Sequence, residues 1–94
     1  MPRRWALVTG ASSGIGRALA LRAAEGRYNL IAVARDTARL KALSEQCRDR
    51  HGGEVRVLAQ DLSHPDAAAK IESWLKRQGI SVDLLVNNAG FGVH

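Results

Sequence analysis

Short apolar runs alternate along this 94-residue chain with longer segments in which apolar residues recur at helical spacing. The short runs predict four strands, and the segments between them predict three helices. The predicted strands are Trp5–Val8, Asn29–Ala34, Glu54–Leu58 and Val82–Val86. Strict alternation of strand and helix favours a parallel sheet with right-handed crossovers and helices on its faces. We therefore expect half of a doubly wound α/β fold, with strands in the spatial order 3-2-1-4.

The first predicted helix begins at Ile15 and ends where Gly26 fits a C-cap glycine. Its predicted apolar stripe consists of Ile15, Ala18, Leu19 and Ala23. Arg22 lies on the same stripe, so either its stem runs along apolar surface or the helix is rolled.

The second predicted helix starts at Asp36 or Thr37 and ends at Gly52-Gly53. Its buried stripe is predicted to be Leu40, Leu43 and Cys47. A third helix is predicted to start at Ser63, with a proline and an acidic residue following closely, and to close at Gly79. Its core-facing residues are predicted to be Ile71, Trp74 and Leu75.

The unusual motifs of the chain all follow predicted strands. The glycine-rich segment Thr9–Gly16, with the sequence TGASSGIG, joins the first strand to the first helix. In this context its glycines allow a tight turn, a close approach of the backbone to a pyrophosphate, and close packing of the helix. The amides that open the helix, together with its dipole, favour negative charge. Ligands of such folds bind at the carboxyl ends of the strands.

This T-G-x-x-x-G-x-G spacing, Asp61-Leu62 after the third strand and Asn87-Asn88-Ala89-Gly90 after the fourth together resemble the short-chain dehydrogenase/reductase family. The resemblance covers the whole chain and implies that residues 1–94 are the N-terminal part of a single NAD(P)-binding Rossmann domain. The cofactor-binding residues that it implies in the glycine-rich loop are Thr9, Gly10, Ser12, Ser13, Gly14, Ile15 and Gly16. Those that it implies at the later strand ends are Asp61 at the adenine edge, Leu62 beside it, and Asn88, Ala89 and Gly90 along the cofactor.

Each of the later positions also has a purely structural interpretation. Without the family resemblance, Asp61 would be interpreted as a solvated carboxylate at the strand end or as a helix cap. The resemblance favours a contact with the adenine instead. Asn87 and Asn88 are also typical turn residues, and we expect at least one of them to be mainly scaffold.

The end of the second strand bears on the choice of cofactor, because NAD users commonly place an acidic residue there. Here Ala34 occupies that position, followed by Arg35 and, one helical turn later, Arg39. Arg35 offers planar, bidentate donors to a 2′-phosphate, which favours NADP over NAD. Two alternatives stay open: Arg35 is a surface residue, paired with Asp36 or with nothing, or the strand ends one residue later and Asp36 is the acidic residue. Many NADP users also carry a basic residue where this chain has Ser13.

The chemistry that the resemblance implies is hydride transfer between the nicotinamide and a carbonyl or alcohol substrate. In the family it uses a serine and a Tyr-x-x-x-Lys pair. Neither matches here, since Tyr28 is the only tyrosine and Ala32 stands four residues after it. We therefore expect no catalytic residue in this chain and no activity of the chain alone. We expect a fragment of an NADP(H)-dependent oxidoreductase; the alternative is a naturally short, non-catalytic dinucleotide-binding protein.

Composition and charge narrow the possible partners. The net charge is +5, but the basic residues are scattered and aromatic residues are few, which argues against nucleic acid. No signal peptide or membrane-spanning run is expected, and the lone Cys47 fits a reducing compartment, so the prediction is a cytoplasmic protein. His51, His64 and His94 are not convincing ligands, and no metal is expected. The resemblance further implies that the full-length protein is a homo-oligomer.

Overall fold

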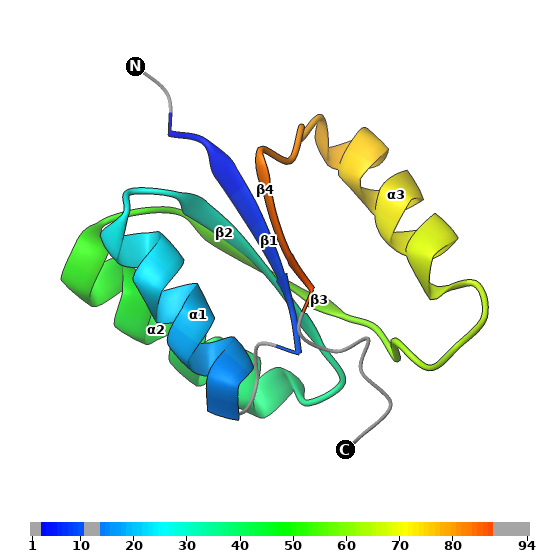
Figure 1. Cartoon of the computed structure of the whole chain (residues 1–94), viewed down its shortest axis with the longest axis horizontal. Coiled ribbons are helices and arrows are strands. Elements are labelled where there is room, and N and C mark those ends of the chain that lie inside the picture. The colour runs from blue at the N-terminus through cyan, green and yellow to red at the C-terminus, as the bar shows by residue number, and fades with distance from the viewer. Residues whose placement is uncertain (1–2, 11–13, 88–94) are drawn as a thin grey trace.

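The computed structural model describes residues 3–10 and 14–87 of the chain. Its elements in order are β1 (Trp5–Thr9), α1 (Gly14–Glu25), β2 (Asn29–Ala34), α2 (Thr37–His51), β3 (Val55–Ala59), α3 (Ala67–Gln78) and β4 (Leu84–Asn87). The described strands are parallel and lie in the order β3-β2-β1-β4 (Figure 1). Both the α/β class and the strand order predicted from the sequence are confirmed. The third and fourth strands begin one and two residues later than predicted.

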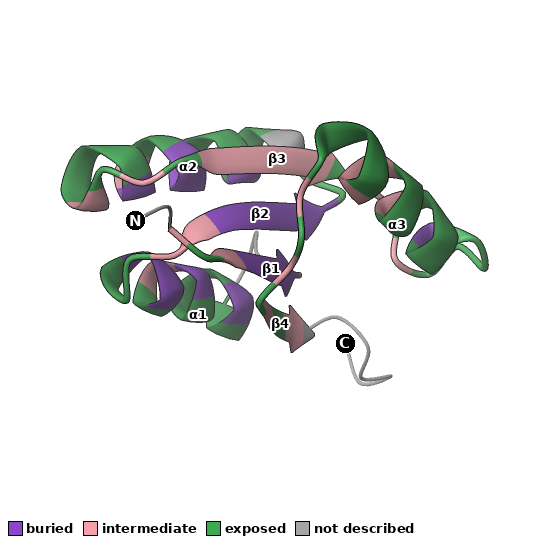
Figure 2. Ribbon diagram, turned by 90° about the horizontal axis from the view of Figure 1, so that it is seen from above, coloured by how far each residue is buried: buried purple, intermediate pink, exposed green. Residues whose placement is uncertain are grey.

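The sheet is covered by α1 and α2 on one face and by α3 on the other (Figure 1). Alternate strand residues point to opposite faces. Val8, Leu30 and Ala32 therefore pack toward α1 and α2, and Leu7, Ile31 and Val33 pack toward α3. The two central strands β1 and β2 carry most of the buried residues of the sheet, whereas the edge strand β3 is only partly buried (Figure 2).

The orientation of α1 differs from the prediction. Ile15 is 69% exposed and Leu19 is 37% exposed, and Ala18 is exposed as well, so only Ala23 of the predicted stripe is buried. The other buried residues of the helix are Gly16, Ala20 and Ala24. Because these side chains are small, the helix can pack close to the sheet on this face. Close packing of the helix backbone therefore determines how the helix is rotated about its axis. Arg22 is correspondingly exposed, which resolves its two readings in favour of a rolled helix.

The end of α1 also differs from the prediction, because Gly26 is not the left-handed residue. Arg27 adopts φ 68°, and it is the only non-glycine residue with positive φ in the described part of the chain. Arg27 N–H donates to the Ala24 carbonyl, and Tyr28 N–H donates to the Ala23 carbonyl. These two bonds form a Schellman motif in which Arg27 occupies the position usually given to glycine.

The second helix follows the prediction closely. Asp36 is its N-cap, with the carboxylate accepting from Arg39 N–H at 3.1 Å. Gly52 closes it in the left-handed region with φ 71°. Cys47 is buried on its inner face, as predicted, and burial raises the pKa of its thiol against the opposing effect of Arg17.

The third helix begins later than predicted. Its first residue is Ala67, and Asp66 occupies the N-cap position without a side-chain capping bond. Ser63 is therefore not the cap, because its hydroxyl and N–H are both engaged by the Asp61 carboxylate. Gly79 closes the helix with φ 69°, as predicted. Ile71, Trp74 and Leu75 pack against the sheet, also as predicted.

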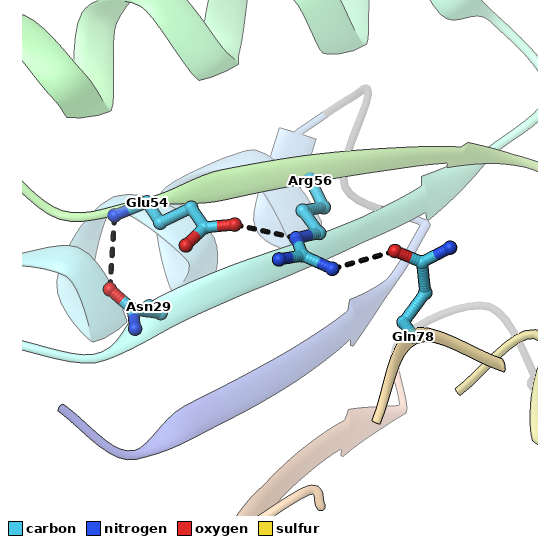
Figure 3. Close-up of polar contacts among 4 residues, drawn as sticks. All are labelled: Asn29, Glu54, Arg56 and Gln78. Atoms are coloured by element: carbon cyan, nitrogen blue, oxygen red, sulfur yellow. Dashed lines mark hydrogen bonds and ion pairs between the residues drawn. The ribbon is translucent and has the colours of Figure 1, made fainter. Parts of the chain in front are cut away.

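A network of polar side chains ties the strands together near the amino end of β3 (Figure 3). Glu54 N–H donates to Asn29 Oδ1 at 3.0 Å. Arg56 Nε donates to Glu54 Oε2 at 2.5 Å, and Arg56 Nη1 donates to Gln78 Oε1 at 2.6 Å. The guanidinium also lies 5.4 Å from the ring centre of Trp5, within cation–π range. Arg56 thereby connects the edge strand to β1 and to the end of α3.

Candidate functional site

Two backbone hydrogen bonds gather the strand ends into one site. Gly10 N–H donates to the Val33 carbonyl at 2.9 Å, and Gln60 N–H donates to the Ala34 carbonyl at 3.1 Å. The start of the glycine-rich loop, Arg35 and Asp61 therefore meet at the carboxyl edge of the sheet. This is the edge at which open parallel sheets bind ligands.

The glycine-rich loop follows directly from β1. Thr9 is buried, and its hydroxyl donates to the Val86 carbonyl of β4 at 3.4 Å. Gly10 and Gly14 both have positive φ, at 66° and 49°, a conformation that side chains rarely adopt. A Cβ built on Gly14 meets no described atom within 4 Å, so the backbone at the start of α1 is open to an approaching group.

Two further positions of the glycine-rich segment lie in the first turn of α1. Gly16 is buried against the sheet, and Ile15 is exposed at the first turn of the helix. Ser12 and Ser13 lie outside the described residues.

The β2 strand ends at Ala34, as predicted, and the charged residues Arg35, Asp36 and Arg39 that follow it have different contacts. Asp36 caps α2 and also pairs with Arg39, at 3.3 Å between Arg39 Nε and Asp36 Oδ2. Arg35 is exposed and has no hydrogen bond or ion pair with a described residue. The ion pair of Asp36 is therefore with Arg39 and not with Arg35, and Asp36 stands beyond the end of the strand. Arg35 is the cation left available at this edge.

Asp61 follows β3, and its carboxylate is exposed. Its pKa lies below the ordinary value because Oδ1 accepts hydrogen bonds from the Ser63 hydroxyl and the Ser63 N–H, with smaller contributions from nearby Arg35 and His64. Leu62 packs inward against the Leu7, Ile31 and Val33 cluster. In the connection between β3 and α3, Leu62 thus packs into the core and the Asp61 carboxylate accepts hydrogen bonds at the surface.

The fourth strand ends beside the loop. Asn87 is its last residue and is the register partner of Thr9. Asn88, Ala89 and Gly90 lie outside the described residues, as does His94. No group of three or more potential metal-ligating side chains occurs among residues 3–10 and 14–87.

An apolar hollow of about 510 Å³, which the sequence analysis does not predict, borders the site on the α3 side of the sheet. Thr9 and Leu62 line its end near the site, and Leu85, which is 63% exposed, lines it from β4. Its remaining lining comes mainly from α3, including Ala68, Ile71 and Leu75.

A parallel sheet with a glycine-rich turn after its first strand, a free arginine after its second and a carboxylate after its third defines a dinucleotide-binding class of fold. Comparison with known proteins specifies the family. Residues 4–94 match the family model described as short chain dehydrogenase. The chain belongs to the short-chain dehydrogenase/reductase family.

Individual relatives agree with this assignment. The very-long-chain 3-oxoacyl-CoA reductase of Aspergillus clavatus is 35% identical over 86 residues, which cover 92% of this chain and 25% of that protein. A short-chain dehydrogenase from Sphingobium yanoikuyae, solved in complex with NADPH, is 43% identical with a TM-score of 0.82, covering 94% of this chain and 34% of that one. L-Sorbose reductase from Gluconobacter frateurii, solved with NADPH and L-sorbose, is 32% identical with a TM-score of 0.87, covering 96% of this chain and 34% of that one.

The chain thus spans between a quarter and about a third of the length of these relatives. Within the described residues, no helix has the length and apolar character needed to cross a membrane.

Proposed function

We propose that this chain is the N-terminal, cofactor-binding part of a single Rossmann domain and that it binds NADP(H) for an oxidoreductase acting on a carbonyl or alcohol. The observation that carries the proposal is the free Arg35 guanidinium directly after β2, at the same edge as Gly10, Gly14 and Asp61. Two structural relatives whose solved complexes contain NADPH support the choice of cofactor.

The described residues fit a dinucleotide. Gly14 leaves open space where a side chain would stand, so a pyrophosphate has room to meet the first amides of α1. Arg35 would hold the 2′-phosphate, and Arg39 lies one turn further along for assistance. Asp61 would accept from the adenine amino group, and Leu62 would support it from the core side. When bound, the cofactor would supply the hydride chemistry, and this part of the chain would supply binding and orientation.

The remaining assignments follow from the family resemblance. Thr9, Gly10, Ile15 and Gly16 would shape the loop, with Ser12 and Ser13 as phosphate contacts. Asn88, Ala89 and Gly90 would lie along the cofactor. We find no match to the family's catalytic serine and Tyr-x-x-x-Lys pair among residues 1–94, so we expect these residues alone to have no reductase activity.

The test is a titration of NADPH and NADH against the wild type and the Arg35→Ala variant of the full natural chain. A hydrogen bond to a charged group contributes roughly 1.5–3 kcal/mol, so Arg35→Ala should weaken NADPH binding about ten- to a hundredfold. NADH affinity should barely change, because NADH has no 2′-phosphate. Equal losses for both cofactors would show that Arg35 is only structural, and a wild-type preference for NADH would overturn the NADP assignment.

The matched variant is Ala34→Asp. An acidic residue at the strand end repels the 2′-phosphate and offers an acceptor to the free ribose hydroxyls. It should shift the preference toward NADH. Ala34 is only 5% exposed and packs in the core, so the urea midpoint of this variant is measured beside its affinities. An unchanged preference in a folded variant would mean that the end of β2 does not contact the ribose.

A further inference from the structure

Ser63 lies two residues beyond Asp61 in the connection between β3 and α3. Its N–H donates to Asp61 Oδ1 at 3.0 Å, and its hydroxyl donates to the same oxygen at 2.6 Å. Both residues are exposed, so water competes for these bonds. A short hydroxyl–carboxylate bond is charge-assisted and stronger than a neutral one, which favours a fixed geometry even at the surface.

Local hydrogen bonds hold Ser63 in this position. His64 N–H donates to the Asp61 carbonyl at 3.1 Å, and Ala67 N–H donates to the His64 carbonyl at 3.0 Å. Asp66 N–H donates to His64 Nδ1 at 3.1 Å. Because α3 begins only at Ala67, the Ser63 hydroxyl has no capping role and is engaged entirely by Asp61.

The two oxygens of the Asp61 carboxylate are consequently unequal. Oδ1 already accepts two hydrogen bonds, whereas Oδ2 accepts none from a described residue. An ionised carboxylate only accepts hydrogen bonds, so a ligand amino group arriving at this edge would find Oδ2 as its acceptor. The bonds from Ser63 are also the main reason that the pKa of Asp61 is lowered, with Arg35 and His64 adding to the effect.

We propose that Ser63 is a positioning residue for the cofactor: by binding Asp61 Oδ1, it presents Oδ2 to the amino group of the adenine ring. This proposal rests on the proposed function, since it takes Asp61 as the adenine contact. It assigns Ser63 a task different from that of Arg35. Adenine is common to NADPH and NADH, so Ser63 acts equally on both cofactors, whereas Arg35 separates them.

The first test compares wild type, Ser63→Ala and Ser63→Thr in the full natural chain, with NADPH, NADH and nicotinamide mononucleotide as ligands. Ser63→Ala should weaken NADPH and NADH binding by the same factor, about three- to tenfold, which corresponds to one ordinary hydrogen bond. Ser63→Thr keeps the hydroxyl and should restore both affinities. Binding of nicotinamide mononucleotide, which has no adenine, should not change.

The second readout is the pH dependence of NADPH affinity, which a merely structural serine would not move. The lowered pKa keeps Asp61 ionised to lower pH in the wild type, so removing the hydroxyl should make affinity fall at a higher pH on acidification. His64 and Arg35 are the other charged or titratable groups facing Asp61. The profiles are therefore compared in a His64→Gln background, and Arg35 stays charged throughout.

The outcomes are distinguishable. A wild type that binds no NADPH removes the proposed function and this proposal with it. A wild type that binds NADPH, beside a Ser63→Ala variant with unchanged affinity and an unchanged acid limb, overturns the role of Ser63 alone. A loss that extends equally to nicotinamide mononucleotide would also overturn it, because it would reflect a disturbed loop rather than a misplaced adenine contact.

Discussion

The two ends of the sheet use their polar groups in opposite ways. At the amino end, polar groups bind one another: Trp5 N–H donates to Asp83 Oδ2 at 2.9 Å, and Arg56 joins Glu54 to Gln78 (Figure 3). The helix ends there are closed as well, with Gly52 and Gly79 as left-handed caps. Arg3 Nη2 also donates to the carbonyl of His51, the last residue of α2, whereas Arg3 Nη1 is buried without a hydrogen-bond partner among the described residues.

At the carboxyl end, the key groups are left without such partners. Arg35 has no bond to a described residue, Asp61 Oδ2 has none, and the backbone at Gly14 faces open space. Arg35 lies near enough to Asp61 to help lower the pKa of its carboxyl, but no ion pair joins these two described residues. The difference is what the proposed function expects, with an amino end that stabilises the fold and a carboxyl end left for the proposed cofactor.

The largest effect on this comparison should come from Arg56→Ala at the amino end. The substitution removes an ion pair, a side-chain hydrogen bond and a cation–π contact from one half-buried guanidinium. We expect the free energy of unfolding to fall by about 1–2 kcal/mol, measured by urea denaturation. The free energy of unfolding of Arg56→Lys should lie between those of the wild type and Arg56→Ala, because lysine keeps the positive charge but lacks the planar guanidinium with its several donors. An unchanged urea midpoint in Arg56→Ala would show that these Arg56 contacts do not stabilise the fold.

A smaller loss is expected from Asn29→Ala, which deletes the acceptor of Glu54 N–H at the start of β3. The cost should be about 1 kcal/mol of unfolding free energy. Asn29→Asp retains Oδ1 and serves as the matched control, with stability close to that of the wild type. Equal losses in both variants would point to packing of the side chain rather than to this hydrogen bond.

A gain is expected from Arg27→Gly at the end of α1. Arg27 has φ 68°, which costs a non-glycine residue roughly 1 kcal/mol. Removing its side chain should raise the unfolding free energy by about that amount, as a shift of the urea midpoint. Glu25→Gly, two residues earlier and still helical, should instead destabilise by roughly 0.5–1 kcal/mol. A loss in both variants would contradict a strained Arg27.

The smallest effect on stability should come from Arg35→Ala at the carboxyl end. An exposed side chain without a described partner should change the unfolding free energy by no more than about 0.5 kcal/mol. The same substitution is expected to change NADPH affinity strongly. A large loss of stability would show that Arg35 stabilises the fold. The carboxyl end of the sheet would then not differ from the amino end in this respect.

The parts of the fold that the sequence predicted well are those in which burial and chain geometry agree. Leu40, Leu43 and Cys47 combine helical spacing with large apolar volume, and they are buried as predicted. The rotation of α1 about its axis is predicted wrongly when large apolar residues such as Ile15 and Leu19 are taken to mark the buried face, because small residues form that face. Gly16, Ala20 and Ala24, spaced by four, carried the correct signal in the sequence.

The details of the site were less accessible to sequence reasoning. The strand end at Ala34 and the free Arg35 follow from a pattern, but the pairing of Asp36 with Arg39 depends on side-chain rotamers. The sequence predicts Ser63 as the cap of α3, but a short polar side chain can equally well bind a neighbouring carboxylate, as Ser63 does with Asp61. Only the later start of α3 decides between these two possibilities.

The most direct test of the division between the two ends is to follow backbone amide resonances of the full natural chain while NADPH is added. The account predicts that the amides of Gly10, Gly14, Arg35 and Asp61 at the carboxyl end shift together with one saturation curve. The amides of Gly26, Gly52 and Gly79 at the amino end should stay in place. Shifts concentrated at Gly26, Gly52 and Gly79, with the carboxyl end unchanged, would contradict it.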